Sequence, residues 1–211
     1  MWLHFLSVMR PYRVFSIGDV QKLFPGMNPN NLVRWQKKGY IIKIRNGWYC
    51  FNDTESSENI DWLAANLIYA PSYISLHAAL SYYGVIPEGI FETTSITTRK
   101  TNHFETFLGS YSYHHVKQDI FGFGQILVQV NAESSLTGKG RKIVMASPEK
   151  ALLDFLYIHS QYNTEQEMVH LRLDETVLEE TLNEKFYAYL ERYTNRALEN
   201  RVSKMRKAYA L

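Results

Sequence analysis

The sequence has little of several features that define large classes of proteins. Its 211 residues include a single cysteine, Cys50, so an intrachain disulfide and a cysteine-based zinc site are excluded and a reducing compartment is indicated. No segment reaches the roughly 20 apolar residues that a transmembrane helix needs. The start, MWLHFLSVMR, lacks the basic segment and cleavage site of a signal peptide, and we expect a helix there. These absences predict a cytoplasmic protein.

Motifs for catalysis and cofactor binding are also missing. Residues 138–141 (GKGR) lack P-loop spacing, no G-x-S-x-G occurs, and Cys50 has no evident activating base. The seven histidines lack the spacing of metal ligands, so packed or hydrogen-bonded histidines are expected. Asp154 is expected at the surface or in a helix cap. The sequence therefore predicts no catalytic residue, no metal and no cofactor.

The small net charge of +2 conceals an uneven distribution. Residues 1–52 carry eight basic side chains and one acidic residue, Asp19, for a net charge of +7. Residues 195–211 carry +4, and the segment between carries −9. A basic N-terminal segment suits binding to a phosphate backbone. The alternative is a solvated surface with uneven charge.

Residues 15–51 follow the order of a helix-turn-helix with a β-wing. Ser16 predicts a capped helix with an apolar face of Ile17, Val20, Leu23 and Phe24, and Pro25-Gly26 ends it. Asn28 and Pro29 then predict a second helix, with Leu32, Val33 and Gln36 at turn spacing, that ends at Gly39. Residues 40–51 predict a hairpin around Asn46-Gly47, a type I′ turn signal.

The polar residues of the second helix and the wing are the candidate DNA-binding residues. Asn30, Asn31 and Arg34 are the residue types that read base edges in the major groove, Asn with adenine and Arg with guanine. Lys37, Lys38, Lys43 and Arg45 suit phosphate contacts, and Asn28 lies at the helix start. The alternative is a winged helix that contacts only protein.

Residues 52–58 are polar and predict a domain boundary. Beyond it we expect helices at 59–69 and 72–83, strands at 93–98, 109–116, 124–130 and 141–146, a turn at 121–124, a helix capped by Ser147, and helices from Thr164 with breaks near Leu173-Asp174 and Tyr193-Thr194. The last, Arg196–Lys207, is expected to pack on the domain with some phosphate contact. The predicted class is α+β, with a winged helix-turn-helix at 1–52 and a mixed α/β domain ending in helices at 59–211.

Several segments in this order resemble one known family. They are Gly47-Trp-Tyr49, the run from Tyr73 (YISLHAALSYYG) with Ile86-Pro-Glu88, Thr97-Thr-Arg-Lys100, Tyr113-His-His-Val116 with Phe121-Gly122, and the run from Ala146 (ASPEKALLD). The chain resembles, over about residues 10–160, the AbiEi-type antitoxins of type IV toxin–antitoxin systems, relatives of abortive-infection regulators. The resemblance implies a winged helix that represses its own operon at inverted repeats, and a C-terminal domain that opposes a nucleotidyltransferase toxin. It supplies no catalytic residues.

The leading hypothesis is therefore a DNA-binding transcriptional regulator of the antitoxin type and not an enzyme. Its expected partners are double-stranded DNA and a nucleotidyltransferase-type toxin, and inverted repeats would suit a homodimer on DNA. A second hypothesis is a protein-interaction module, residues 59–211, that neutralises a toxin directly while DNA binding is secondary. A third is a transferase-like enzyme with its site near Lys150, Asp154 and the histidines.

Overall fold

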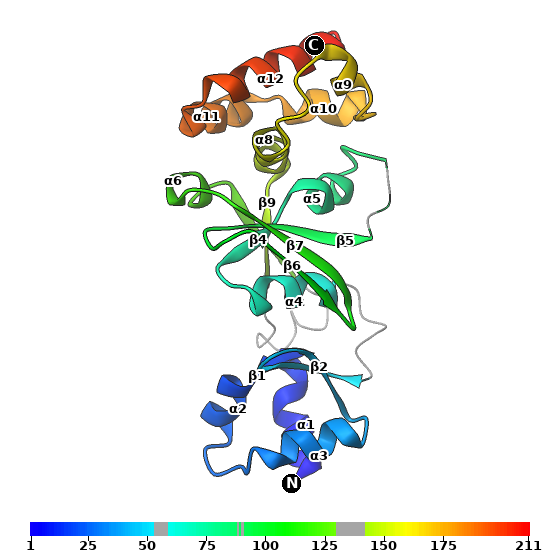
Figure 1. Ribbon diagram of the computed structural model, residues 1–211, viewed down its shortest axis with the longest axis vertical. Coiled ribbons are helices and arrows are strands. Elements are labelled where there is room, and N and C mark those ends of the chain that lie inside the picture. The colour runs from blue at the N-terminus through cyan, green and yellow to red at the C-terminus, as the bar shows by residue number, and fades with distance from the viewer. Residues whose placement is uncertain (53–58, 88, 90, 130–141) are drawn as a thin grey trace.

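The computed structural model describes residues 1–52, 59–87, 89, 91–129 and 142–211. The described part is elongated, with a small N-terminal unit at one end, a larger sheet in the middle and a layer of helices at the other end (Figure 1). This arrangement of helices and mixed sheet confirms the predicted α+β class. The expected boundary at residues 52–58 lies, except for Asn52, outside the described residues, as do residues 138–141.

The N-terminal unit combines helices with an antiparallel three-stranded sheet of order β1-β3-β2. Its elements are α1 (Trp2–Met9), a 3₁₀ turn (Arg10–Tyr12), β1 (Val14–Ser16), α2 (Ile17–Leu23), α3 (Asn30–Lys37), β2 (Ile41–Arg45) and β3 (Trp48–Phe51). The predicted N-terminal helix is confirmed, whereas β1 was not predicted. Aromatic rings dominate the core: the ring of Phe5 lies 4.5 Å from that of Trp35 and 5.7 Å from that of Phe15, centroid to centroid.

The two short helices begin close to where the sequence predicts. The Asp19 N–H donates to Ser16 Oγ (3.0 Å) and the Ser16 N–H donates to an Asp19 carboxylate oxygen (2.8 Å), which confirms the cap of α2. The second helix begins at Asn30, and Asn28 Oδ1 accepts the Asn30 N–H (2.9 Å) just before it. The predicted apolar face of α2 is only partly correct, because Val20 is buried while Ile17 and Leu23 are exposed.

The turn of the β2–β3 hairpin differs from the predicted type I′ geometry. Gly47 has a positive φ of 83°, whereas Asn46 is not among the described residues with positive φ. The strand register also shifts between Lys43 and Arg45. An irregularity of this kind changes the local twist, so the chain reverses with one left-handed residue instead of two.

The second domain is built on a mixed six-stranded sheet of order β6-β7-β5-β4-β9-β8. Its elements are α4 (Ile60–Ile68), β4 (Ser72–Ile74), α5 (Leu76–Tyr82), β5 (Glu92–Thr97), β6 (Asn102–Thr106), β7 (Gly109–His115), α6 (Gln118–Phe121), β8 (Gln125–Gln129), β9 (Lys142–Ala146), α8 (Pro148–Ile158), α9 (Glu165–Val169), α10 (Glu175–Thr181), α11 (Glu184–Tyr193) and α12 (Arg196–Ala208). The pairs β5/β7 and β4/β9 are parallel, and the other strand pairs are antiparallel.

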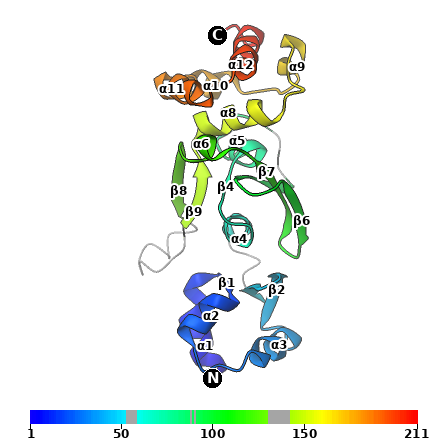
Figure 2. The ribbon, with the colours of Figure 1, turned by 60° about the vertical axis from the view of Figure 1, so that its left-hand side comes forward.

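Helices cover both faces of this sheet in layers. Helix α4 lies on the side of the N-terminal unit, α5 and α8 lie on the opposite side, and α9–α12 form a further layer over α8 (Figures 1 and 2). The two domains are in contact, since Val14, Ile44 and Cys50 of the small sheet belong to the larger hydrophobic core. The layers therefore place α3 and α12 at opposite ends of the molecule (Figure 1).

Most predicted elements of the second domain form, with three corrections. The strands near 93–98, 109–116, 124–130 and 141–146 and the helix capped by Ser147 are confirmed. The predicted helix at 72–83 is wrong at its start, because Ser72–Ile74 forms the central strand β4 between β5 and β9. A short apolar run has no period that separates strand from helix, and its position inside the sheet decides. Strand β6 was not predicted. Helix α6 includes Phe121, the first residue of the turn that was expected at 121–124.

The helical tail has both predicted breaks and a third one. It is interrupted at Leu171–Asp174 and at Thr194, as expected, and also between α10 and α11. There the Asn183 side chain accepts the Phe186 N–H (3.1 Å) and starts α11. An internal cap of this type starts a new helix where the apolar spacing alone would allow a continuous one.

A fully buried ion pair joins α8 to its surroundings, contrary to the expected surface position of Asp154. Asp154 and Lys150 are both buried, and the Lys150 ammonium donates to Asp154 Oδ1. Burial lowers the pKa of Lys150, and the Asp154 carboxylate opposes that effect. Helices α11 and α12 pack against α8 and shield this pair from solvent.

Hydroxyl groups from three other elements also donate hydrogen bonds to this carboxylate. Tyr73 of β4 (2.9 Å) and Ser75 before α5 (2.8 Å) donate to Oδ2, and Tyr193 of α11 donates to Oδ1 (2.7 Å). The Lys150 ammonium also donates to the Tyr193 hydroxyl (2.7 Å) and lies 4.8 Å from the centroid of the Phe123 ring. Both oxygens of Asp154 are thus hydrogen-bonded, which a buried charge requires.

Replacing Asp154 by alanine should destabilise the protein strongly. The Asp154→Ala variant leaves the Lys150 ammonium buried without its counter-ion, so we expect the free energy of unfolding to fall by about 3–5 kcal/mol. Urea denaturation followed by circular dichroism measures this. The control is Glu179→Ala, an exposed carboxylate on α10, for which we expect a change within about 0.5 kcal/mol. Similar losses for the two variants would contradict a stabilising pair.

Candidate nucleic-acid interface

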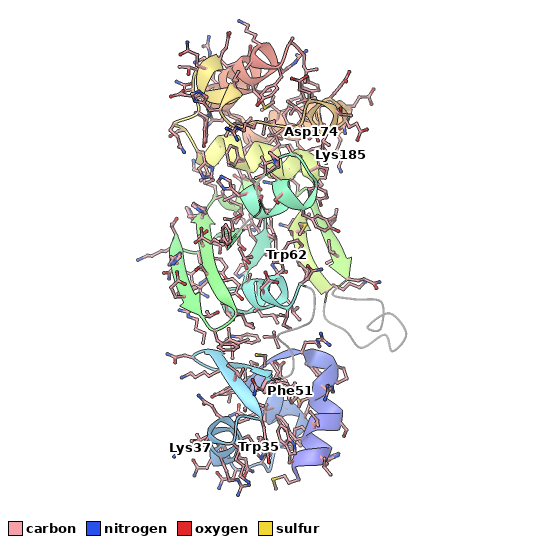
Figure 3. The ribbon with its side chains drawn as sticks, turned by 90° about the vertical axis from the view of Figure 1, so that its right-hand side faces the viewer. Trp35, Lys37, Phe51, Trp62, Asp174 and Lys185 are labelled. Carbon is pink, nitrogen blue, oxygen red and sulfur yellow. The ribbon has the colours of Figure 1, made fainter. Side chains whose placement is uncertain are left out.

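Helix α3 presents one polar face to solvent and is held by an aromatic core behind it. Asn30, Arg34 and Lys37 are exposed and lie at positions i, i+4 and i+7, on one side of the helix. The opposite side carries Leu32 and Trp35, which are buried. Figure 3 shows Lys37 at the outer edge of the N-terminal unit and Trp35 directed inward. The helix therefore has a fixed orientation and a free face.

Aromatic contacts from α1 hold this helix in place. The Trp2 ring lies 5.0 Å from the Trp35 ring and 4.7 Å from the Tyr40 ring, centroid to centroid. Ring pairs at these separations contribute beyond their buried area. The segment MWLHFLSVMR is thus the support on which the polar face of α3 depends.

Asn31 occupies a different position from the one expected for a base-reading residue. It is only 8% exposed, and its Oδ1 accepts a hydrogen bond from Arg34 Nη2 (2.8 Å). Because 31 and 34 are one turn apart, the amide holds the guanidinium on the helix surface. The structure thus gives Asn31 the role of orienting Arg34, and it leaves Asn30 and Arg34 as the exposed pair.

Val33 and Gln36, which were expected at turn spacing with Leu32, are both exposed, whereas Leu32 is buried. Val33 is 51% exposed and lies between Asn30 and Lys37 on the free face. A methyl-bearing side chain at such a position suits the C5-methyl group of thymine. Sequence reasoning missed it, although its spacing of three from Asn30 was the available signal.

The lysines expected to contact phosphate surround this face. Lys37, Lys38 and Lys43 are exposed, and the Lys38 ammonium lies 5.9 Å from the centroid of the Tyr40 ring. The one acidic residue of this segment, Asp19, has its carboxylate engaged with the Ser16 backbone and hydroxyl. The exposed charge near α3 is therefore positive, as binding to a polyanion requires.

Arg45 is turned toward the second domain instead of the expected phosphate contact. Its guanidinium lies 3.6 Å from the centroid of the Phe104 ring, and Nη1 donates to the Ile68 carbonyl at the end of α4 (3.2 Å). The register shift before Arg45 accompanies this orientation. Arg45 is thus an interdomain contact, and Lys43 is the cation of β2 that remains exposed.

The histidines and the basic residues of α12 are the remaining candidates from the sequence. Within the described ranges, no group of three His, Cys, Asp or Glu side chains could hold a metal ion. The rings of His77 and His159 pack 5.1 Å apart, and burial lowers the pKa of His159 to about 4. On α12, Arg201 is buried and Lys204 donates to Asn163, so packing accounts for part of its basic stripe. Among the described helices, none is long and apolar enough to cross a membrane.

Comparisons of the sequence with protein families and with curated proteins identify no relative. No protein-family model matches the sequence, and no curated protein matches it either.

The interdomain position of Arg45 predicts a stability effect that an exposed lysine lacks. We expect Arg45→Ala to lower the free energy of unfolding by about 1–2 kcal/mol, because it removes the contact with Phe104 and the bond to the Ile68 carbonyl. The matched control, Lys43→Ala, should change it by less than about 0.5 kcal/mol. Thermal and urea unfolding measure both. A larger loss for Lys43→Ala would show that Arg45 does not join the domains.

Proposed function

We propose that this chain binds double-stranded DNA through α3 as a transcriptional regulator of the antitoxin type. The observation that carries the proposal is the free face of α3, on which Asn30, Val33, Arg34 and Lys37 lie together over an aromatic core. A net charge of +7 over residues 1–52 supports it. The α2–α3 pair followed by the β2–β3 hairpin would act as a winged helix-turn-helix.

The chemistry of the face divides into base and phosphate contacts. Arg34 would donate to guanine O6 and N7 and Asn30 would pair with adenine, while Val33 would contact a thymine methyl group. Lys37, Lys38 and Lys43 would bind phosphates and set the register of the helix in the groove. Because Asn31 holds the guanidinium of Arg34, less side-chain entropy would be lost on binding.

The regulatory role proposed for this binding rests on the family resemblance. It would be repression of the chain's own operon at inverted repeats, coupled to neutralisation of a nucleotidyltransferase toxin by the second domain. The two longest segments of the resemblance meet in the fold: Tyr73 and Ser75 of one bond Asp154 of the other. A chain that contains both segments can form this buried network, which supports an architecture shared by this chain and the family that it resembles.

Binding of a partner protein by the second domain is the second candidate function. Most of the larger hydrophobic core belongs to this domain, although Val14, Ile44 and Cys50 of the N-terminal unit join it. Phe91, just before β5, is 99% exposed and Tyr82, at the end of α5, is 49% exposed, so the two rings offer apolar surface to a partner. The proposed toxin would bind here while α3 remains free for DNA.

Arg34→Ala should weaken sequence-specific DNA binding. The loss of a bidentate contact to guanine is expected to cost about 1–3 kcal/mol and to relax specificity at one base position. Fluorescence anisotropy with the DNA upstream of the chain's own gene measures it, with Arg196→Ala on α12, at the far end of the molecule, as the control.

Lys37→Ala distinguishes phosphate contacts from base contacts in the same assay. It should weaken binding to all sequences alike and reduce the slope of log K against log[salt] by about 1. Unchanged affinity of Arg34→Ala would remove Arg34 from the interface. The absence of any binding at low salt would refute the DNA-binding proposal.

The two proposed activities should separate in the full-length protein. The double variant Arg34→Ala/Lys37→Ala changes only exposed residues of α3, so we expect it to lose operator binding and to keep toxin neutralisation. Growth of cells that co-express the variant and the product of the adjacent gene measures the second activity. Loss of rescue by a folded, normally expressed variant would make DNA binding essential to neutralisation.

A further inference from the structure

A small cleft at one end of the large sheet combines aromatic and acidic side chains. It lies where β5 and β7 begin, between α4 and α5, and has a volume of about 220 Å³. Asp61 and Trp62 come from α4, Tyr82 is the last residue of α5, Phe91 directly precedes β5, and Glu92 is the first residue of β5. Figure 3 labels Trp62 in the middle of the second domain, well separated from α3.

Three aromatic side chains, Trp62, Tyr82 and Phe91, form part of the cleft wall. The rings of Trp62 and Tyr82 lie 5.3 Å apart at an angle of 81°, so the edge of one ring packs against the face of the other. Tyr82 is 49% exposed and Phe91 is almost fully exposed, which leaves ring surface available at the mouth. Aromatic faces carry partial negative charge and attract cations.

The polar part of the cleft is acidic and lacks an internal counter-ion for Asp61. The Thr93 hydroxyl donates to Asp61 Oδ2 (3.3 Å), and across the described ranges no Lys, Arg or His pairs with this carboxylate. Burial raises the pKa of Asp61. Glu92 Oε1 contacts His103 Nδ1 (2.9 Å) on the outer side of the sheet. A bound cation would supply a counter-charge to the Asp61 carboxylate.

We propose that this cleft binds a guanidinium group, the side-chain head of an arginine from a partner protein. A guanidinium is planar, stacks on aromatic faces and carries donors in a fork that fits carboxylates. The volume suits one such head with part of its stem, and the two carboxylates disfavour phosphates and other anions. The site lies apart from α3, so it does not depend on the proposed DNA binding; it rests on the second candidate function, partner binding by this domain, because Phe91 belongs to both.

The chain itself shows that its aromatic rings accept guanidinium groups. Arg45 lies 3.6 Å from the centroid of Phe104, Arg192 lies 4.0 Å from that of Phe123, and Arg99 lies 4.2 Å from that of Tyr69. In the cleft, rings of the same kind are present without an arginine of the described chain against them. A guanidinium from another molecule would make the same kind of contact as these three arginines.

Nuclear magnetic resonance titration of the full-length protein tests this site. The probe is N-acetyl-arginine methylamide, and its neutral isostere N-acetyl-citrulline methylamide is the control. We expect saturable shifts around Asp61, Trp62 and Tyr82 with the arginine probe only. Equal binding of the citrulline probe, or no binding of the arginine probe, would overturn the proposal.

Two variants locate the binding in the cleft. Asp61→Asn keeps the shape of the side chain and removes its charge, and Tyr82→Ala removes a half-exposed wall; each should weaken binding at least about tenfold. Asp119→Asn, an exposed carboxylate on α6, should leave the affinity unchanged. Unchanged affinity in Asp61→Asn would overturn the assignment, and DNA affinity measured on the same variant separates this result from the α3 proposal.

A last binding experiment identifies the source of the guanidinium. A short peptide with one arginine next to a leucine should bind more tightly than the single-residue probe, because the exposed Phe91 and Tyr82 rings offer apolar contact at the mouth. A peptide that binds more weakly than the single-residue probe would contradict a partner protein and would assign the cleft to a small guanidine.

Discussion

The buried pair of Lys150 and Asp154 is the interaction on which the second domain depends. Two opposite charges removed from water are tolerable only when every donor and acceptor around them is satisfied. Tyr73, Ser75 and Tyr193 satisfy both oxygens of the carboxylate, and they come from two separate segments of the chain. The pair therefore links the central strand, the start of α5, helix α8 and helix α11. A charge that needs so many partners favours one arrangement of these elements over others.

The N-terminal unit depends on a different constraint, the packing of a few large rings in a small volume. With fewer than 60 residues, such a unit has little area to bury, and aromatic side chains supply more of it per residue. Trp2 and Phe5 of α1 hold Trp35, and this leaves the opposite face of α3 free. Arg45 and the buried Val14, Ile44 and Cys50 then attach the unit to the larger domain. Rigid support behind an exposed polar face is what the proposed DNA recognition needs.

Local signals in the sequence predicted the fold where they act over a few residues. The cap formed by Ser16 and Asp19, the start of α8 at Ser147 and the strands β5 and β7 follow from such signals. The prediction of a helix at Ser72–Ile74 was wrong, because a short apolar segment takes the structure of its neighbours in the sheet. The cleft formed by Asp61, Trp62 and Tyr82 had no sequence signal, since its residues come from separate elements.

The sequence by itself determined the α+β class, the concentration of positive charge in residues 1–52 and the identity of the polar residues on α3, because composition and short-range periodicity specify these. Only the tertiary structure decided what each polar residue does. Asn31 turns inward to hold Arg34, Arg45 turns to Phe104, and Asp154 becomes the buried partner of Lys150. The physical reason is that burial and hydrogen-bond partners depend on contacts between residues far apart in the chain, and no local pattern encodes them.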